Sequence, residues 1–269
     1  DIAKGEALST IYGSSDPLLS TPERRLNLYN IKRFWCTCAR CMSDDLIRGV
    51  RCSQCPEGTA YHSLERETQG LPPWQCHTCK AYLVPEADQA FAETLQLEKE
   101  WRDSLDNTIW DIELIIRKHP PSKAKEVIEY LDRGFGREHV IFRTVQFKLA
   151  EAQILRAFLH KLYPGEDRQQ SFVQGLTMLC DFYDWAKSKP LHRMCYIAIV
   201  RIALFALTSA DTYPYLFANS PKGLHERVQK LVCDIDEPTF TLDALSGVMR
   251  GDERLARCIR NIASEFTDA

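Results

Sequence analysis

Apolar residues recur every three or four positions through most of the chain after Val84. Stripes at residues 91–116 and 145–162 each predict an amphipathic helix. Proline breaks separate further predicted helices at residues 167–188, 191–209, 222–234, 239–249 and 252–266. Helices joined by short proline-containing turns pack as antiparallel pairs. We therefore expect a mainly α fold with a tetratricopeptide-like helical bundle, although the strict repeat signature of that architecture is absent.

The first part of the chain has a different pattern. A Lys-Gly-Glu turn leads into a short run of β-forming residues that ends near Tyr12, which predicts one strand. Because a single strand is not stable alone, we expect the rest of its sheet to lie upstream of Asp1. A helix is predicted over residues 22–30, with Thr21 as its N-cap and a proline in its first turn.

Length and composition indicate a protein with a sizeable core. The chain has 269 residues, of which 45% are hydrophobic and 26% charged. The longest apolar run, residues 194–207, is interrupted by Arg201 and is short for a bilayer-spanning helix. No apolar signal segment stands at the start. These features predict a protein of the cytoplasm or nucleus that has no membrane partner.

The charge balance gives little attraction to nucleic acid. The formal net charge is −3, so direct nucleic-acid binding is not expected. Locally, the segment of residues 33–51 is basic. The acidic residues between Glu86 and Glu113 are expected to form a solvated helix face, the alternative being that they meet a basic substrate tail.

Seven of the eleven cysteines fall into two clusters. The second cluster, Cys52, Cys55, Cys76 and Cys79, has the spacing C-x2-C, twenty residues, C-x2-C. Two such cysteine knuckles form a tetrahedral cage of four sulfurs, which suits zinc. Because this set has four protein ligands and no open position, the predicted zinc site is structural and supplies folding energy to a small ribbon.

The first cluster is one ligand short. Cys36, Cys38 and Cys41 have the spacing C-x-C-x2-C, whereas a structural zinc site takes four ligands. The fourth ligand is expected from His62, from His77, from a distant cysteine, or from protein outside this sequence. A variant in which one of these histidines replaces a cysteine of the second cluster is an alternative.

Disulfides and a redox pair are the competing interpretations of the cysteines. Disulfides would indicate a secreted protein, and a thioredoxin-like pair would need a βαβ context, which the sequence lacks. The remaining cysteines and most histidines are scattered through the predicted helices without metal-ligand spacing, and we predict that the cysteines are core residues. They are Cys180, Cys195, Cys233 and Cys258.

Three segments that precede the ribbon resemble a known family. The runs at residues 2–12, 21–28 and 34–41 are similar to the end of a SET domain joined to a post-SET motif in the SET-and-MYND-domain (SMYD) family of protein-lysine methyltransferases. The residues that carry the resemblance are Ile2, Gly5, Glu6, Leu8, Tyr12, Thr21, Glu23, Arg24, Arg25, Leu28, Phe34, Cys36, Cys38 and Cys41.

The resemblance implies a role for several residues. Tyr12 matches the active-site tyrosine, and Phe34 matches the aromatic residue that packs on the adenine of S-adenosylmethionine. Cys36, Cys38 and Cys41 match the post-SET zinc ligands, whose fourth partner in the family is a cysteine of the SET core. The implied activity is methyl transfer to a lysine of a histone or another protein. The cofactor-binding Gly-x-Gly segment lies outside this sequence, so the chain alone is expected to be inactive.

We therefore predict three regions. Residues 1–44 are the end of a SET domain with a short β piece and the post-SET motif, residues 45–84 are a four-cysteine zinc ribbon, and residues 85–269 are the helical domain. The resemblance implies that the helical domain forms a wall of the substrate groove, and it is expected to contact protein partners. The competing hypothesis is a non-catalytic, zinc-stabilised helical module that binds a protein or peptide.

Overall fold

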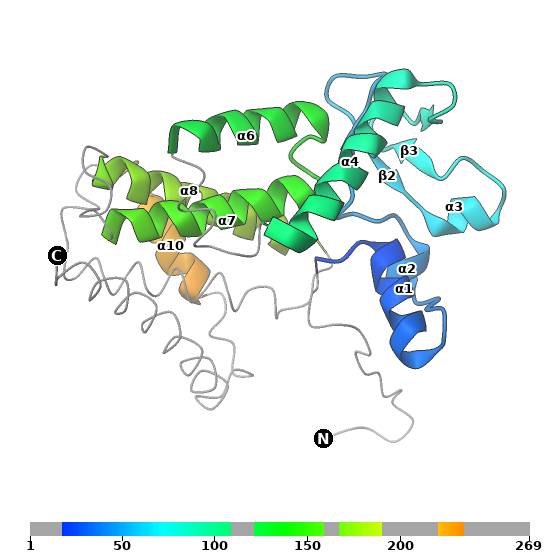
Figure 1. Cartoon of the computed structure of the whole chain (residues 1–269), viewed down its shortest axis with the longest axis horizontal. Helices are drawn as coiled ribbons and strands as arrows, with labels where there is room; N and C mark the ends of the chain where they lie inside the picture. The colour runs from blue at the N-terminus through cyan, green and yellow to red at the C-terminus, as the bar shows by residue number, and fades with distance from the viewer. Residues whose placement is uncertain (1–17, 109–120, 159–166, 190–219, 234–269) are drawn as a thin grey trace. The chain divides into compact units, whose positions relative to one another are not determined.

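The computed structural model describes residues 18–108, 121–158, 167–189 and 220–233 (Figure 1). Within these residues the fold is mainly helical with one small antiparallel sheet, which confirms the predicted class at that level. In chain order the elements are α1 (Thr21–Lys32), α2 (Ala39–Met42), β1 (Val50–Arg51), β2 (Thr59–His62), α3 (Leu64–Thr68), β3 (Trp74–Cys76), β4 (Tyr82–Leu83), α4 (Gln89–Thr108), α6 (Pro121–Gly134), α7 (Val140–Phe158), α8 (Arg168–Lys187) and α10 (Leu224–Cys233).

The chain divides into two compact units. The described residues of the first unit include α1 to α4, the sheet, most of α6, the start of α7 and the end of α8. The second unit contains most of α7 and α8 together with α10. The three regions predicted at residues 1–44, 45–84 and 85–269 stay a prediction.

The sheet positions both pairs of the four-cysteine cluster. Cys76 is the last residue of β3, and Cys52 directly follows β1. Its strands pair in the order β1-β2-β3-β4, all antiparallel, with Val50 opposite Ala60 and Ala60 opposite Cys76. These three residues are fully buried. Short strands such as these cannot stand alone, so the sheet depends on what packs against it.

Helix α4 closes the core of the sheet. Phe91 of α4 is 2% exposed and meets Trp74 edge to face, with the ring centroids 5.4 Å apart. Backbone hydrogen bonds also tie the ribbon to later helices: Arg51 N–H donates to the Phe135 carbonyl at 2.8 Å, and Val140 N–H donates to the Ile47 carbonyl at 2.7 Å. The ribbon and α4 therefore share one core, and backbone hydrogen bonds connect the ribbon to the segments at the end of α6 and the start of α7.

The N-terminus of α1 differs by one position from the prediction. Ser20, not Thr21, is the N-cap, because Glu23 stands three residues after Ser20 and accepts its backbone N–H at 2.7 Å. This reciprocal arrangement is a capping box. Thr21 lies inside the helix, and its N–H donates to Asp45 at 2.6 Å. Helix α1 also extends two residues beyond the predicted end.

The predicted helices that fall in described residues are confirmed in α4, α7, α8 and α10. Helix α6 was not predicted: its sequence begins directly after a proline, and Pro121 occupies the first helical position, where proline is well tolerated. The helices predicted at residues 191–209, 239–249 and 252–266 lie outside the described residues, as does the strand that ends near Tyr12. None of the described helices combines the length and apolar character that crossing a bilayer requires.

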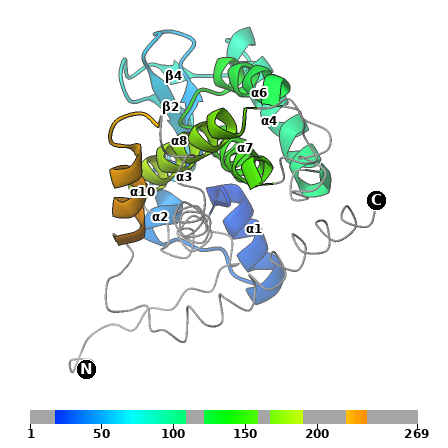
Figure 2. The ribbon, with the colours of Figure 1, turned by 90° about the vertical axis from the view of Figure 1, so that its left-hand side faces the viewer.

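The second unit has a helical core of its own. Phe147 of α7 and Phe182 of α8 are buried, with ring centroids 5.0 Å apart. Gly175 of α8 leaves no room for a side chain, since a Cβ there would lie 2.8 Å from Ile154. Figure 2 shows α10 beside α8, where Arg227 pairs with Asp181 at 3.1 Å. Cys180 lies in this core and is 2% exposed, as predicted for a core cysteine.

A buried carboxylate joins four parts of the first unit. Glu98 of α4 is 2% exposed, and it accepts two hydrogen bonds from Arg48 at 2.6 Å, one from Arg102 at 2.7 Å and one from His139 at 3.2 Å. Arg102 also pairs with Glu23 of α1. The prediction that the acids of residues 86–113 form a solvated face is thus wrong at Glu98, which is the anionic centre of a buried cluster.

The geometry fixes the protonation states in this cluster. His139 Nδ1 accepts the Ile141 N–H at 3.1 Å, so Nε2 carries the proton of a neutral ring and donates it to Glu98. Burial lowers the pKa of His139. Burial opposes ionisation of Glu98 too, but hydrogen bonds from His139 and Arg48 hold the pKa of that carboxyl well below its usual range. A second histidine, the half-buried His62, has its pKa lowered to about 4 by partial burial and by Arg48 and Arg66.

We expect the free energy of unfolding to fall as the pH drops below about 6.5, the ordinary value for histidine. His62 and His139 have lowered pKa values in the fold, so the unfolded chain binds their protons first and is stabilised by them. Each histidine contributes a slope of up to about 1.4 kcal/mol per pH unit. Glu98, whose pKa is also lowered in the fold, adds a further loss of stability when the pH falls below the usual pKa of a glutamate. Urea unfolding between about pH 7 and pH 5, with bound zinc measured at each point, provides the check.

The matched control for this pH dependence is the double variant His62→Gln/His139→Gln. It should flatten the slope between about pH 6.5 and 5, although its stability at neutral pH is lower. A double variant with the wild-type slope would show that other groups cause the acid sensitivity.

Candidate metal centre

The four sulfurs of the second cluster have the separations of a tetrahedral metal site. Cys52, Cys55, Cys76 and Cys79 place their sulfur atoms within 4.8 Å of one another. The Cys52–Cys79 distance is 3.8 Å and the Cys55–Cys76 distance is 3.7 Å. Zinc–sulfur bonds of about 2.3 Å give a tetrahedron whose edges are about 3.8 Å. The predicted ligand set is therefore brought together, and its size suits zinc.

Each pair of cysteines sits in a turn whose backbone points toward the sulfur. Gln54 N–H donates to Cys52 Sγ at 3.3 Å, and Thr78 N–H donates to Cys76 Sγ at 3.4 Å. Hydrogen bonds of this kind favour the thiolate, which is the form that binds metal. Although burial opposes it, the N–H groups of Cys79 and Thr78 lower the pKa of Cys76 to about 7.

The other thiols show why a cation is needed. Burial and the three neighbouring sulfurs raise the pKa of Cys55 to about 12, and burial raises the pKa of Cys52. Four thiols this close cannot all ionise without a positive charge among them. A metal ion supplies that charge and displaces the protons, which links metal binding to folding of the ribbon.

Gly58 leaves space for the sulfurs. A Cβ at this position would lie 2.3 Å from Cys55 Sγ and 2.5 Å from Cys76 Sγ. The Gly58 carbonyl also accepts the Cys52 N–H at 2.8 Å, which holds the first turn against the sheet. Only glycine fits here without moving two metal ligands.

Replacing Gly58 by alanine is expected to weaken zinc binding by about tenfold or more, because displaced ligands lose affinity on the scale known for supporting residues. Overpacking should also lower the free energy of unfolding by about 1 to 3 kcal/mol. Competition with a chromophoric chelator measures the affinity. The control is Glu57→Ala at the exposed neighbouring position, and a Gly58→Ala chain that retained wild-type affinity would show that the ligands do not need this space.

The first cluster brings three sulfurs together, without a fourth ligand from the part of the chain that the structure describes. Cys36, Cys38 and Cys41 lie within 4.8 Å of one another, with Cys41 buried and Cys38 exposed. Burial raises the pKa of Cys41 to about 11, against the effect of Arg24, whose guanidinium lies 3.8 Å from its sulfur. Among the residues that the structure describes, no histidine, cysteine or carboxylate joins these three sulfurs.

The two candidate histidines have other neighbours. His77 Nε2 lies 2.6 Å from Asp44, and its ring packs on Tyr61 with centroids 4.5 Å apart. The His62 ring meets Trp74 edge to face at 5.4 Å. Neither histidine belongs to either cysteine cluster of the described chain, so the histidine alternatives receive no support.

Of the two residues expected at the catalytic and cofactor positions, the structure describes only Phe34. Tyr12 lies outside the described residues. Phe34, two positions before Cys36, is 39% exposed. It belongs to a set of exposed apolar side chains on α1 and the segment after it, which we call the α1 apolar surface: Leu26, Tyr29, Ile31, Phe34 and Trp35. Tyr29 and Trp35 stack at 4.6 Å, so part of this surface is ordered by its own contacts.

Comparison with known proteins adds no assignment. The chain matches no protein-family model and no curated protein at a significant level.

Proposed function

We propose that this chain is the C-terminal portion of a SMYD-like protein-lysine methyltransferase that uses S-adenosylmethionine, with zinc in both cysteine clusters. The observation that carries the proposal is the three-cysteine cluster, which begins two positions after the exposed Phe34 and lacks a fourth ligand among the described residues. The sequence resemblance implies that a cysteine from a SET core would complete the cluster.

The incomplete ligand set supports a site assembled from two parts. Cys36, Cys38 and Cys41 converge, and zinc in a structural site needs one more ligand than they provide. Cys38 is exposed, so a ligand from another segment can approach the cluster. A post-SET motif that closes against a SET core has this requirement.

The α1 apolar surface supports the same proposal. Several large apolar side chains exposed within one short segment of a globular protein indicate a place where something else binds. Phe34 stands two positions before the first cysteine, where it would pack on the adenine ring of the cofactor. Leu26, Tyr29 and Ile31 would then be covered by the SET core.

Methyl transfer to an amine requires a neutral amine, an in-line approach and exclusion of water. When bound, S-adenosylmethionine supplies the methyl group. Tyr12 would orient the lysine amine through its hydroxyl, as a hydrogen-bond partner. The zinc clusters take no part in this step; they would hold the segments on either side of Phe34 in place.

A non-catalytic interaction module is the second candidate. The α1 apolar surface favours it equally, since the same exposed side chains can bind a partner protein without any chemistry. The two candidates differ in whether the complete protein transfers methyl groups and whether Tyr12 matters to that transfer.

We expect Tyr12→Phe to lower the turnover of the complete enzyme by about 10²-fold or more, the scale on which loss of one hydrogen-bond partner in the transition state acts. The ring remains, so stability and cofactor affinity should change little. Phe34→Ala should instead weaken S-adenosylmethionine binding by roughly 1 to 3 kcal/mol, by analogy with base–aromatic stacking. Single-turnover methyl transfer and calorimetry separate these two effects.

Tyr82→Phe is the matched control, because Tyr82 is an exposed tyrosine of β4. It should leave turnover and cofactor binding unchanged. A Tyr12→Phe enzyme with wild-type turnover would remove Tyr12 from the site, and a complete protein that transfers no methyl group would favour the interaction module.

A further inference from the structure

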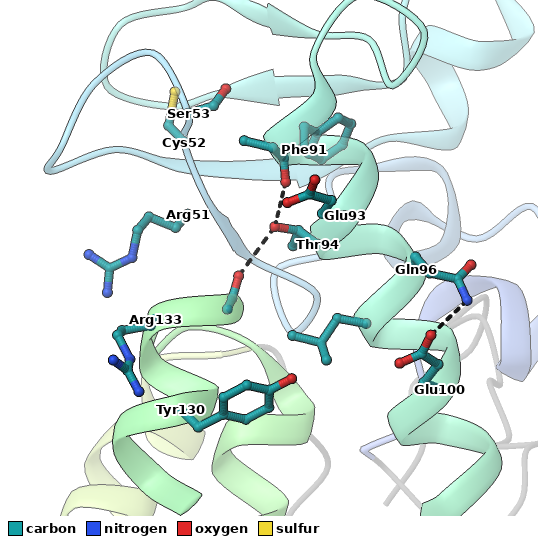
Figure 3. Close-up of a pocket in the computed structure, with 13 residues that line it drawn as sticks. Arg51, Cys52, Ser53, Phe91, Glu93, Thr94, Gln96, Glu100, Tyr130 and Arg133 are labelled. Atoms are coloured by element: carbon teal, nitrogen blue, oxygen red, sulfur yellow. Dashed lines mark hydrogen bonds between the residues drawn. The ribbon is translucent and has the colours of Figure 1, made fainter. Parts of the chain in front are cut away.

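A groove of about 510 Å³ lies between α4, α6 and the first cysteine turn of the ribbon (Figure 3). It is separate from the α1 apolar surface, and neither the zinc sites nor methyl transfer assigns it a role. Its volume is in the range of sites that bind small molecules and short peptide segments.

The two helices touch at one end of the groove and leave it open beyond. Gly134 at the end of α6 approaches α4 so closely that a Cβ would lie 2.5 Å from Leu97. Thr94 Oγ1 of α4 donates to the Gly134 carbonyl at 3.3 Å. With Phe91 buried behind them, these contacts form a fixed floor.

One wall of the groove is basic and has unused hydrogen-bonding capacity. Arg51 and Arg133 lie on the same side of the groove, with Tyr130 below them (Figure 3). Arg51 donates to Asp132 through Nη2 alone, at 2.8 Å to the carboxylate and 3.0 Å to the carbonyl. In the described part of the chain, Arg133 has no carboxylate partner and the Tyr130 hydroxyl has no hydrogen bond. The Tyr130 side chain is 47% exposed.

The opposite wall, on α4, is acidic. Glu93 and Glu100 lie along it, and each accepts a hydrogen bond from a glutamine one turn away on the same helix: Gln89 to Glu93 at 3.0 Å and Gln96 to Glu100 at 2.9 Å. The Gln89 amide holds the Glu93 carboxylate without neutralising it. The groove thus presents Arg133, together with Arg51 and its partner Asp132, opposite the Glu93 carboxylate.

This arrangement selects a ligand that carries both signs of charge. A polyphosphate or nucleic-acid strand would be repelled by the acidic wall, and a purely basic tail would be repelled by the arginines. Arginine binds a carboxylate through paired hydrogen bonds, and a tyrosine face attracts a cation. We propose that the groove binds an extended peptide segment that presents an acidic side chain to Arg51 and Arg133 and a lysine or arginine across Tyr130 to Glu93.

The test uses the full zinc-loaded chain and defined probes. Fluorescein-labelled peptides carry one glutamate and one lysine separated by one, two or three alanines, and anisotropy is measured at low ionic strength. At least one spacing should bind saturably. Replacing its glutamate or its lysine by glutamine should weaken binding by about fivefold, as expected for loss of an exposed ion pair at the upper end of its usual strength. Added salt should weaken binding as well.

Variants place the binding in the groove. Arg133→Glu should abolish binding of the glutamate–lysine peptide and create binding of a lysine–lysine peptide of the same spacing. Lys99→Glu makes the same charge change at an exposed position of α4 outside the groove lining and should have no effect. Zinc content and circular dichroism confirm folding, and Arg133→Gln replaces Arg133→Glu if the latter does not fold.

Three results would overturn the proposal: no peptide binds saturably, the glutamine-substituted peptides bind as well as the charged pair, or the Arg133 variants bind like the wild type. Binding of ATP or of a single-stranded oligonucleotide that displaces the peptides through Arg133 would also overturn it, since the groove would then be a polyanion site.

Discussion

Replacing Cys76 by serine is expected to abolish metal binding at the four-cysteine site and to unfold the ribbon. Cys76 is fully buried at the centre of the sheet and its sulfur is one of four that lie within 4.8 Å of one another. Structural zinc supplies about 10 to 16 kcal/mol to small zinc-finger domains, which is as large as the whole stability of an ordinary domain, about 5 to 15 kcal/mol. The short strands of this sheet cannot compensate for that loss.

Hydrogen exchange resolves how far this unfolding spreads. Residues 50–83 should lose protection, and so should the start of α4, because Phe91 belongs to the same core as Trp74. Helix α8 should keep its protection over residues 168–183, which belong to the second unit.

Cys180→Ser is the matched control for Cys76→Ser, since it makes the same chemical change at a buried cysteine outside both clusters. It should lower stability modestly and leave zinc content unchanged. If Cys76→Ser retained a full zinc complement with a protected ribbon, the ligand assignment would be wrong.

Glu98→Gln is expected to lower the free energy of unfolding by about 3 to 5 kcal/mol, the range for removing one partner from a buried ion pair. The amide cannot compensate the charges of Arg48 and Arg102, which both donate to this carboxylate. Because Arg102 also pairs with Glu23, the loss should loosen α1 as well as α4. Urea unfolding at fixed free zinc gives the magnitude.

Glu93→Gln is the control for Glu98→Gln: it neutralises an exposed carboxylate on the same helix and should change stability by less than about 0.5 kcal/mol. Equal effects of the two substitutions would mean that the buried cluster adds no more stability than a surface charge does.

The parts of this structure that depend on local spacing were predictable. Within each C-x2-C pair, the spacing alone lets both sulfurs point to one place. The structure brings the Cys52 and Cys76 turns together, as this spacing predicts. The stripes that predicted α4, α7, α8 and α10 are equally local, because each reflects the helical period.

The parts that depend on distant residues were not predictable. In the sequence, Glu98 looks like one more exposed acid of an acidic helix. It becomes a buried charge because Arg48, fifty positions earlier, and His139, 41 positions later, contact it in the fold. Phe91 likewise joins the ribbon core through tertiary packing. Local competition between neighbouring candidates explains the remaining error at α1, where Ser20 and Thr21 are both good N-caps and the position of Glu23 decides for Ser20.

Zinc K-edge X-ray absorption on the purified chain, combined with elemental analysis, tests the central claim most directly. We predict at least one zinc per chain, coordinated by four sulfurs at about 2.3 Å, and loss of that signal in Cys76→Ser but not in Cys180→Ser. A chain purified without chelator that contains no zinc, or whose zinc is coordinated mainly by nitrogen and oxygen, would contradict the account.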